Sequence, residues 1–135
     1  MIEKRLLQSS VAVVGLIPVS AGMLGALKGT LMLGDFGDAA LDSHYRYLSG
    51  LLLAIGVAFW TTIPDIERQG ARFSLLTTIV VVGGFFRGLG MFLQGSPGPV
   101  MTAALGVELI VTPLLYLWQQ RLARSAPMDA SAAPR

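Results

Sequence analysis

The sequence predicts an all-α fold, a polytopic membrane four-helix bundle. Hydrophobic residues make up 53% of the 135 residues and charged residues only 13%, whereas a soluble domain needs about 25% charged residues to wet its surface. The apolar residues gather into four stretches, each near the roughly 20 residues that cross a bilayer as a helix. No stretch shows the sustained polar–apolar alternation that predicts a β-strand.

Four membrane spans are expected, in chain order, at residues 6–27, 47–63, 73–93 and 100–118. All four should be helical because lipid offers an unpaired backbone group no other partner. Together they predict a single transmembrane four-helix domain over residues 1–124. The Ala/Ser/Pro-rich residues 125–135 are expected to form a disordered cytoplasmic tail.

The first span has a second interpretation. Lys4 and Arg5 precede an apolar run in which a Val-Ser-Ala tripeptide ends at Ala21, a pattern that resembles a signal peptide and its cleavage site. Cleavage would leave three spans and place the new N-terminus outside. The apolar run continues past Ala21 to Leu27, which favours an uncleaved helix.

The connections between the spans differ. The first, residues 28–46, is long and acidic, and the second, residues 63–72, is short and charged. The third, residues 94–99, reads Gln-Gly-Ser-Pro-Gly-Pro and is a tight turn made of helix breakers. Such a short connection makes the third and fourth helices antiparallel neighbours.

The charges of the loops predict an orientation. With four spans, one side of the membrane carries most of the basic residues: Lys4, Arg5, Arg68, Arg72, Arg121, Arg124 and Arg135. The other side carries Lys28 and Arg46 beside aspartates. Both termini are therefore expected in the cytoplasm, with the acidic first loop outside.

Small residues recur at four-residue spacing on three of the helices, where they would let helix backbones approach closely. They are Ala21, Gly25 and Gly29 on the first helix, Gly50 and Ala54 on the second, and Gly84 and Gly88 on the third. These stripes suit the interior of the bundle, and they equally suit the contact face of a homo-oligomer or of a larger membrane complex.

Two ionisable residues, Arg87 and Glu108, fall deep within the third and fourth spans. A lone charge at the bilayer centre costs about 2.5–3.5 kcal/mol on insertion scales, so such residues usually face the bundle interior and pair. A rise of about 1.5 Å per residue leaves the two at depths about 4–5 Å apart, within reach of an arginine side chain. An Arg87–Glu108 ion pair is therefore predicted, either as a structural clamp or as a polar site for a ligand, proton or ion.

Arg46 and His44 lie where the second span begins. Arg46 is expected either to anchor the helix at the lipid headgroups or to join Arg87 in an outer vestibule that attracts an anionic group. His44, the only histidine, completes the set of candidate ligand-binding residues. The spacing of Asp35, Asp38 and Asp42 would allow weak binding of a hard cation, although a solvated loop is favoured.

Several classes of function find no support. The net charge is only +2, and no basic patch interleaved with aromatic residues indicates nucleic-acid binding. There is no cysteine, and no zinc-ligand set, phosphate-binding loop or dinucleotide fingerprint is present. No catalytic residue, metal or cofactor is predicted, although Glu108 alone could serve as an acid or base toward a lipid or quinone.

Short motifs nevertheless indicate a family. Residues 44–50 read His-Tyr-Arg-Tyr-Leu-Ser-Gly, residues 83–87 read Gly-Gly-Phe-Phe-Arg, and Glu108 follows in the last helix. The pattern resembles the DUF4345 family of small bacterial membrane proteins, which has a general likeness to DoxX-like four-helix proteins. The resemblance implies a four-helix bundle in a bacterial inner membrane, without an established activity, and marks Arg46, Arg87 and Glu108 as the residues to test.

Three functions from different classes are weighed, of which an enzyme or redox accessory that uses Glu108 on a lipid or quinone is the least supported, because a histidine pair, a cysteine and a second carboxylate are missing. Two others remain. The first is a non-enzymatic accessory or interaction module, with the lipid bilayer and other membrane chains as its partners. The second is a binder or transporter of a small anionic or amphipathic molecule, through a polar site around Arg46, Arg87 and Glu108.

Overall fold

A computed structural model describes residues 2–34 and 37–125. Within these ranges all regular structure is helical, which confirms the predicted all-α fold. Three helical segments are long and apolar enough to cross a membrane: Ile2–Met32, Gly70–Gln94 and Pro99–Ser125. The helices form two compact units, Gln8–Pro64 and Met1–Leu7 with Asp65–Arg135, which we call the α1–α2 unit and the α3–α5 unit.

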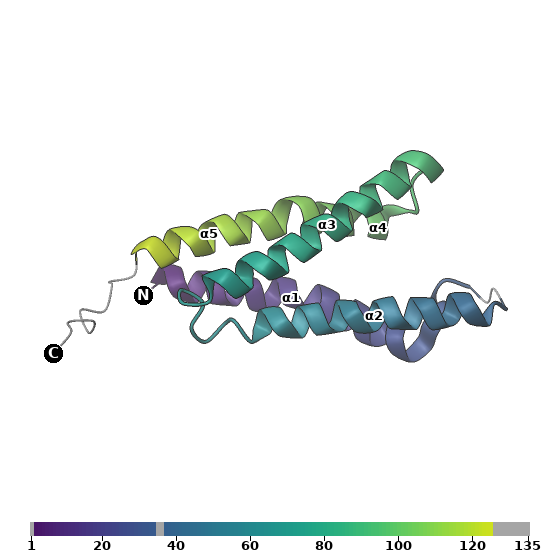
Figure 1. Cartoon of the computed structure of the whole chain (residues 1–135), viewed down its shortest axis with the longest axis horizontal. Helices are drawn as coiled ribbons and strands as arrows, with labels where there is room; N and C mark the ends of the chain where they lie inside the picture. Colours follow the sequence, from purple (N-terminus) through teal and green to yellow (C-terminus); the bar gives the residue numbers. More distant parts are fainter. Residues whose placement is uncertain (1, 35–36, 126–135) are drawn as a thin grey trace. The chain divides into compact units, whose positions relative to one another are not determined.

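The α1–α2 unit is a helical hairpin (Figure 1). It consists of α1 (Ile2–Lys28), whose first residues belong to the other unit, the short 3₁₀ helix η1 (Gly29–Met32) and α2 (Ala39–Trp60). Glycines on α1 allow the two backbones to approach, because a Cβ at Gly22 would lie 2.5 Å from the backbone nitrogen of Leu53. A Cβ at Gly25 would likewise collide with the Ser49 hydroxyl. The hairpin is therefore held at a separation that only residues without a side chain permit.

The small-residue prediction for these two helices is partly correct. Gly25 and Gly29 do meet α2, but Ala21 is exposed and Gly22 makes the closest backbone approach in its place. A Cβ at Gly50 would meet no atom within 4 Å. Four-residue spacing identified the correct helix face on α1 without identifying every contact, since the register against α2 depends on both helices.

Helix α2 begins at Ala39, well before the span predicted from residue 47. Asp38 caps it, because its carboxylate accepts hydrogen bonds from the backbone amides of Ala40 (2.8 Å) and Leu41 (3.1 Å). The polar first turns make α2 less apolar than the three segments that qualify as membrane spans. A hydropathy count marks the apolar part of a helix, whereas the cap determines where the helix begins.

The α3–α5 unit is a second hairpin, and it confirms the predicted pairing of the third and fourth spans. Helix α3 (Gly70–Gln94) turns back through Gly95 and Gly98, both with positive φ, into a rod of three segments. The segments are α4 (Pro99–Gly106), a π-helical turn η2 (Val107–Val111) and α5 (Thr112–Ser125). The rest of the predicted tail, residues 126–135, lies outside the described residues.

The π turn is explained by Pro113, which lies in the first turn of α5. Pro113 has no backbone N–H and therefore cannot continue the α-helical bonding pattern. The helix widens instead: the backbone N–H of Thr112 bonds to the carbonyl of Val107, and the Thr112 hydroxyl donates to the same oxygen at 2.9 Å. The wider turn around Glu108 is a local consequence of this proline.

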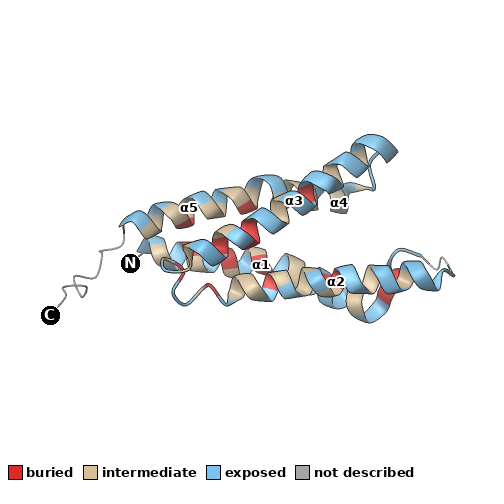
Figure 2. Cartoon of the chain, in the orientation of Figure 1, coloured by how far each residue is buried: buried red, intermediate tan, exposed pale blue. Residues whose placement is uncertain are grey.

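The pattern of exposed and buried side chains is typical of a helical protein embedded in lipid. Large apolar side chains are exposed along the helices, among them Phe85, Phe86 and Phe92 at 66%, 65% and 86% (Figure 2). Polar residues such as Thr77 and Gln119 are buried. Lipid tails solvate apolar side chains as well as a protein interior does, so helix contacts in a membrane use small and polar residues.

Polar contacts at one end of the α3–α5 unit hold the segment that precedes α3. The Lys4 ammonium donates to Glu67 at 2.7 Å, and this hydrogen bond lowers the pKa of the Glu67 carboxyl. The fully buried Gln119 amide donates to the carbonyl of Ile66 at 2.8 Å. Trp118 donates from its indole nitrogen to Glu3 at 3.2 Å.

Candidate functional site

Arg87 and Glu108 form the ion pair predicted from their depths. The guanidinium binds the carboxylate in two places, with Nε 2.8 Å from Oε2 and Nη2 2.8 Å from Oε1. This parallel arrangement is the strongest pairing available to an arginine and a carboxylate. It links α3 to the π turn across 21 residues of sequence, so the charges that would be costly in lipid neutralise one another.

The Arg87–Glu108 pair is packed closely against the backbone of α3 on one side and is exposed on the other. A Cβ at Gly84 would lie 2.8 Å from Cβ of Glu108, so the carboxylate residue sits directly over the helix backbone. The Nη1 group of Arg87 lies 3.2 Å from the sulfur of Met101. Even so, the Arg87 side chain is 32% exposed and that of Glu108 16% exposed, which leaves part of both charged groups accessible.

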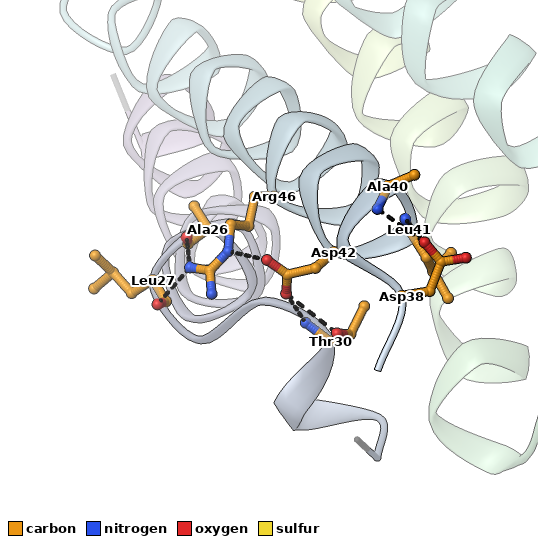
Figure 3. Close-up of polar contacts among 8 residues, drawn as sticks. All are labelled: Ala26, Leu27, Thr30, Asp38, Ala40, Leu41, Asp42 and Arg46. Atoms are coloured by element: carbon orange, nitrogen blue, oxygen red, sulfur yellow. Dashed lines mark hydrogen bonds and ion pairs between the residues drawn. The ribbon is translucent and has the colours of Figure 1, made fainter. Parts of the chain in front are cut away.

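Arg46 occupies a different kind of cluster, at the end of the first hairpin (Figure 3). Its Nε donates to Asp42 at 2.6 Å, and its Nη1 donates to the carbonyls of Ala26 (3.0 Å) and Leu27 (2.8 Å). These carbonyls lie in the last turn of α1, where a helix has no backbone donors left for them. Arg46 therefore acts as a C-terminal cap for α1, a role that neither sequence interpretation included.

Asp42 joins the same cluster to the η1 segment. Its Oδ1 accepts from the backbone amide of Thr30 at 2.8 Å and from the Thr30 hydroxyl at 3.1 Å. The hydrogen bond from Arg46, followed by the one from the Thr30 amide, lowers the pKa of the Asp42 carboxyl. Gly29, with φ of 63°, turns the chain here, and a side chain on it would collide with Asp42 and Arg46.

The remaining candidates have simpler surroundings. His44 is exposed on α2. Of the three aspartates considered for a cation, Asp38 caps α2, Asp42 binds Arg46, and Asp35 lies outside the described residues. Within residues 2–34 and 37–125, no three histidine, cysteine, aspartate or glutamate side chains are grouped so that they could hold a metal ion.

The candidate residues thus divide between the two units. Arg87 and Glu108 meet in the α3–α5 unit, whereas Arg46 and His44 belong to the α1–α2 unit. Asp42 was missed as the partner of Arg46, although its four-residue spacing from Arg46 on one helix is a recognised signal for an ion pair.

Long apolar helices with exposed apolar side chains and internally paired charges define a small helical membrane protein. The family model described as "Domain of unknown function (DUF4345)" matches residues 6–119. The chain belongs to this family, as the motifs around Arg46 and Arg87 predicted. No solved structure matches the chain.

Proposed function

We propose that this protein is a non-enzymatic membrane module that acts by associating with other membrane-embedded chains. The observation that carries the proposal is how its charged groups are used. Arg87 is bound by Glu108, and Arg46 by Asp42 and two backbone carbonyls. Groups already engaged in holding helices together are poorly placed to perform chemistry, while the exposed apolar faces are well suited to packing against other helices.

The exposed aromatic residues of α3 support the same proposal. Phe85 and Phe86 stand edge to face with ring centroids 6.3 Å apart, and both point away from the packed interior of the unit. Aromatic residues, phenylalanine among them, are enriched in the cores of protein–protein contacts. In a helix that faced only lipid, aliphatic residues would serve equally well.

The proposal includes an orientation of the chain in the membrane, with both termini in the cytoplasm. The basic residues around the N-terminus, before α3 and after α5 favour a cytoplasmic location for both termini in a bacterial inner membrane. The opposite side carries only Lys28 and Arg46 as basic residues, and this small number favours the same orientation. Cysteine labelling of intact cells at Ser125 and at Gly34 tests it, with only Gly34→Cys expected to react with a membrane-impermeant reagent.

The association is tested by purifying the tagged chain from native membranes after mild crosslinking, followed by native mass spectrometry. A stoichiometric complex, with itself or with another membrane protein, is the expected result. A monomer with no co-purifying protein, in several detergents and in nanodiscs, would overturn the proposal.

A second candidate function is favoured by the exposed edge of the Arg87–Glu108 pair. A guanidinium that is 32% exposed within a membrane segment can bind the phosphate or carboxylate of an amphipathic molecule. Bound lipids and small molecules would be compared between the natural chain and Arg87→Gln/Glu108→Gln, with Arg72→Gln as the control. An anionic species lost only from the double variant would support binding, and identical profiles would exclude it.

A further inference from the structure

The face of α3 that carries Arg87 is open on both sides of that residue. Gly83 lies four residues before Arg87 and Gly90 three residues after it, spacings that place all three on one side of a helix. Both glycines are exposed, and a Cβ on either would meet no atom within 4 Å. Gly84, by contrast, is covered by Glu108 and Leu109. Within the α3–α5 unit, the surface of α3 around Arg87 is thus free to receive another helix backbone.

The ion pair retains capacity for further hydrogen bonds. Arg87 uses N–H groups on Nε and Nη2 for Glu108 and directs Nη1 at Met101, which accounts for three of the five N–H groups of a guanidinium. Each carboxylate oxygen of Glu108 accepts one bond from Arg87 and has a lone pair to spare. Lipid tails cannot satisfy either group.

A second copy of the same chain offers both signs of charge at the required depth. In a two-fold symmetric dimer with its axis along the membrane normal, equivalent residues lie at equal depth. Two Arg87–Glu108 pairs related by that rotation place each arginine beside the partner copy's glutamate. The pair is therefore complementary in charge to itself, whereas a partner with a single charged residue would leave one group unmatched.

We propose that the face of α3 and η2 formed by Gly83, Arg87, Gly90 and Glu108 is the contact between two copies of this chain. Gly83 and Gly90 let the helices approach, and the two ion pairs merge into a ring of alternating charges. This inference rests on the proposed association function and names the partner and the surface.

The first test blocks the approach of the helices without disturbing the chain itself. Gly83→Leu with Gly90→Leu is expected to weaken dimerisation about tenfold or more, while the thermal midpoint of the monomer stays equal or rises. Gly106→Leu is the matched control: it too has open space, and it lies about 200° around the helix from Glu108. Dimer affinities would be measured by fluorescence energy transfer in vesicles. A double variant that dimerises as tightly as Gly106→Leu would overturn the inference.

The second test exploits the two signs of charge. Chains carrying Arg87→Glu and chains carrying Glu108→Arg, each with its own tag, are expected to repel copies of themselves and to form mixed dimers when co-expressed. Equal formation of all three dimers would contradict the inference. If neither variant accumulates, disulfide crosslinking between copies of Gly83→Cys decides, because that position tolerates a side chain; the absence of a crosslink would also contradict it.

The outcomes separate this inference from the broader proposal. Association with another membrane protein, without self-association through this face, would remove the dimer and leave the module function in place. A dimer that forms equally well with the substituted chains would likewise rule out this contact face and leave the module function in place. Only the complete absence of association would remove both.

Discussion

The two arginine–carboxylate clusters use the same chemistry for different purposes. Arg46 binds an aspartate four residues earlier on its own helix and donates from Nη1 to two backbone carbonyls of α1. Arg87 binds a glutamate 21 residues later on another rod and directs a further donor at a methionine side chain. The first cluster caps the C-terminus of α1, and the second joins two helices at positions away from their ends.

The difference follows from the surroundings of each arginine. At the end of α1, carbonyl groups without partners compete for the guanidinium, so the cluster is partly a replacement for missing backbone bonds. In the middle of α3 the backbone groups are already bonded within the helix, and only an opposite charge can offset the cost of placing Arg87 in lipid. Removing a partner should therefore be far more damaging at Arg87 than at Arg46.

The largest effect is expected from Glu108→Ala, which leaves Arg87 unpaired. Loss of one partner of an ion pair held out of water costs about 3–5 kcal/mol, whereas replacing both by apolar residues is often neutral. Arg87→Met with Glu108→Leu should therefore be more stable than Glu108→Ala alone. Unfolding by dodecyl sulfate in mixed micelles, followed by circular dichroism, measures both, and equal losses would show that leaving Arg87 unpaired carries no cost of its own.

The packing around the second cluster is tested by two glycines, one covered by another side chain and one open. Gly84→Ala places a methyl group 2.8 Å from Cβ of Glu108, and overpacking of this kind costs about 1–3 kcal/mol. Gly106→Ala is the control, since a Cβ there meets no atom within 4 Å and the change gains up to about 1 kcal/mol of helix propensity. The same unfolding measurement applies. If both variants lose stability equally, backbone effects rather than the close contact are responsible.

A smaller, pH-dependent effect is expected at the first cluster. The folded-state pKa of Asp42 is lowered, so its stabilising contribution is fully present above the unfolded pKa of about 3.9 and is lost as the pH falls through the folded value. Asp42→Asn should lower the thermal midpoint at pH 7, and the gap to the natural chain should close in acid. A gap that stays constant down to the lowest accessible pH would refute the assignment.

The smallest effect is expected from the cap of α2. Asp38→Ala removes the acceptor for the amides of Ala40 and Leu41 and should cost about 1 kcal/mol. Ser43→Ala, at a position on the same helix beyond the capped turn, is the matched control. Hydrogen exchange should locate the change in the first turn of α2. Faster exchange throughout the chain would instead indicate that the cap supports more than this helix end.

Much of the fold could be predicted because it depends on composition and on distance along a helix. Apolar length predicted the helices of the three qualifying spans, and the turn of breakers after Gln94 predicted the pairing of α3 with the last rod. The Arg87–Glu108 bond followed from counting helical rise on two antiparallel neighbours. These properties belong to single helices or to directly connected pairs, so the sequence carries them without further information.

The sequence by itself determined that this is a helical membrane protein of the DUF4345 family, with an ion pair between its last two predicted spans. The tertiary structure alone decided that Arg46 caps α1, that Gly22 rather than Ala21 makes the closest approach, and that the helix widens around Glu108. The reason is that each of these depends on which backbone atoms of one segment meet the side chains of another. Periodicity names the face of a helix that packs, and the neighbouring helix selects which atoms on that face come into contact.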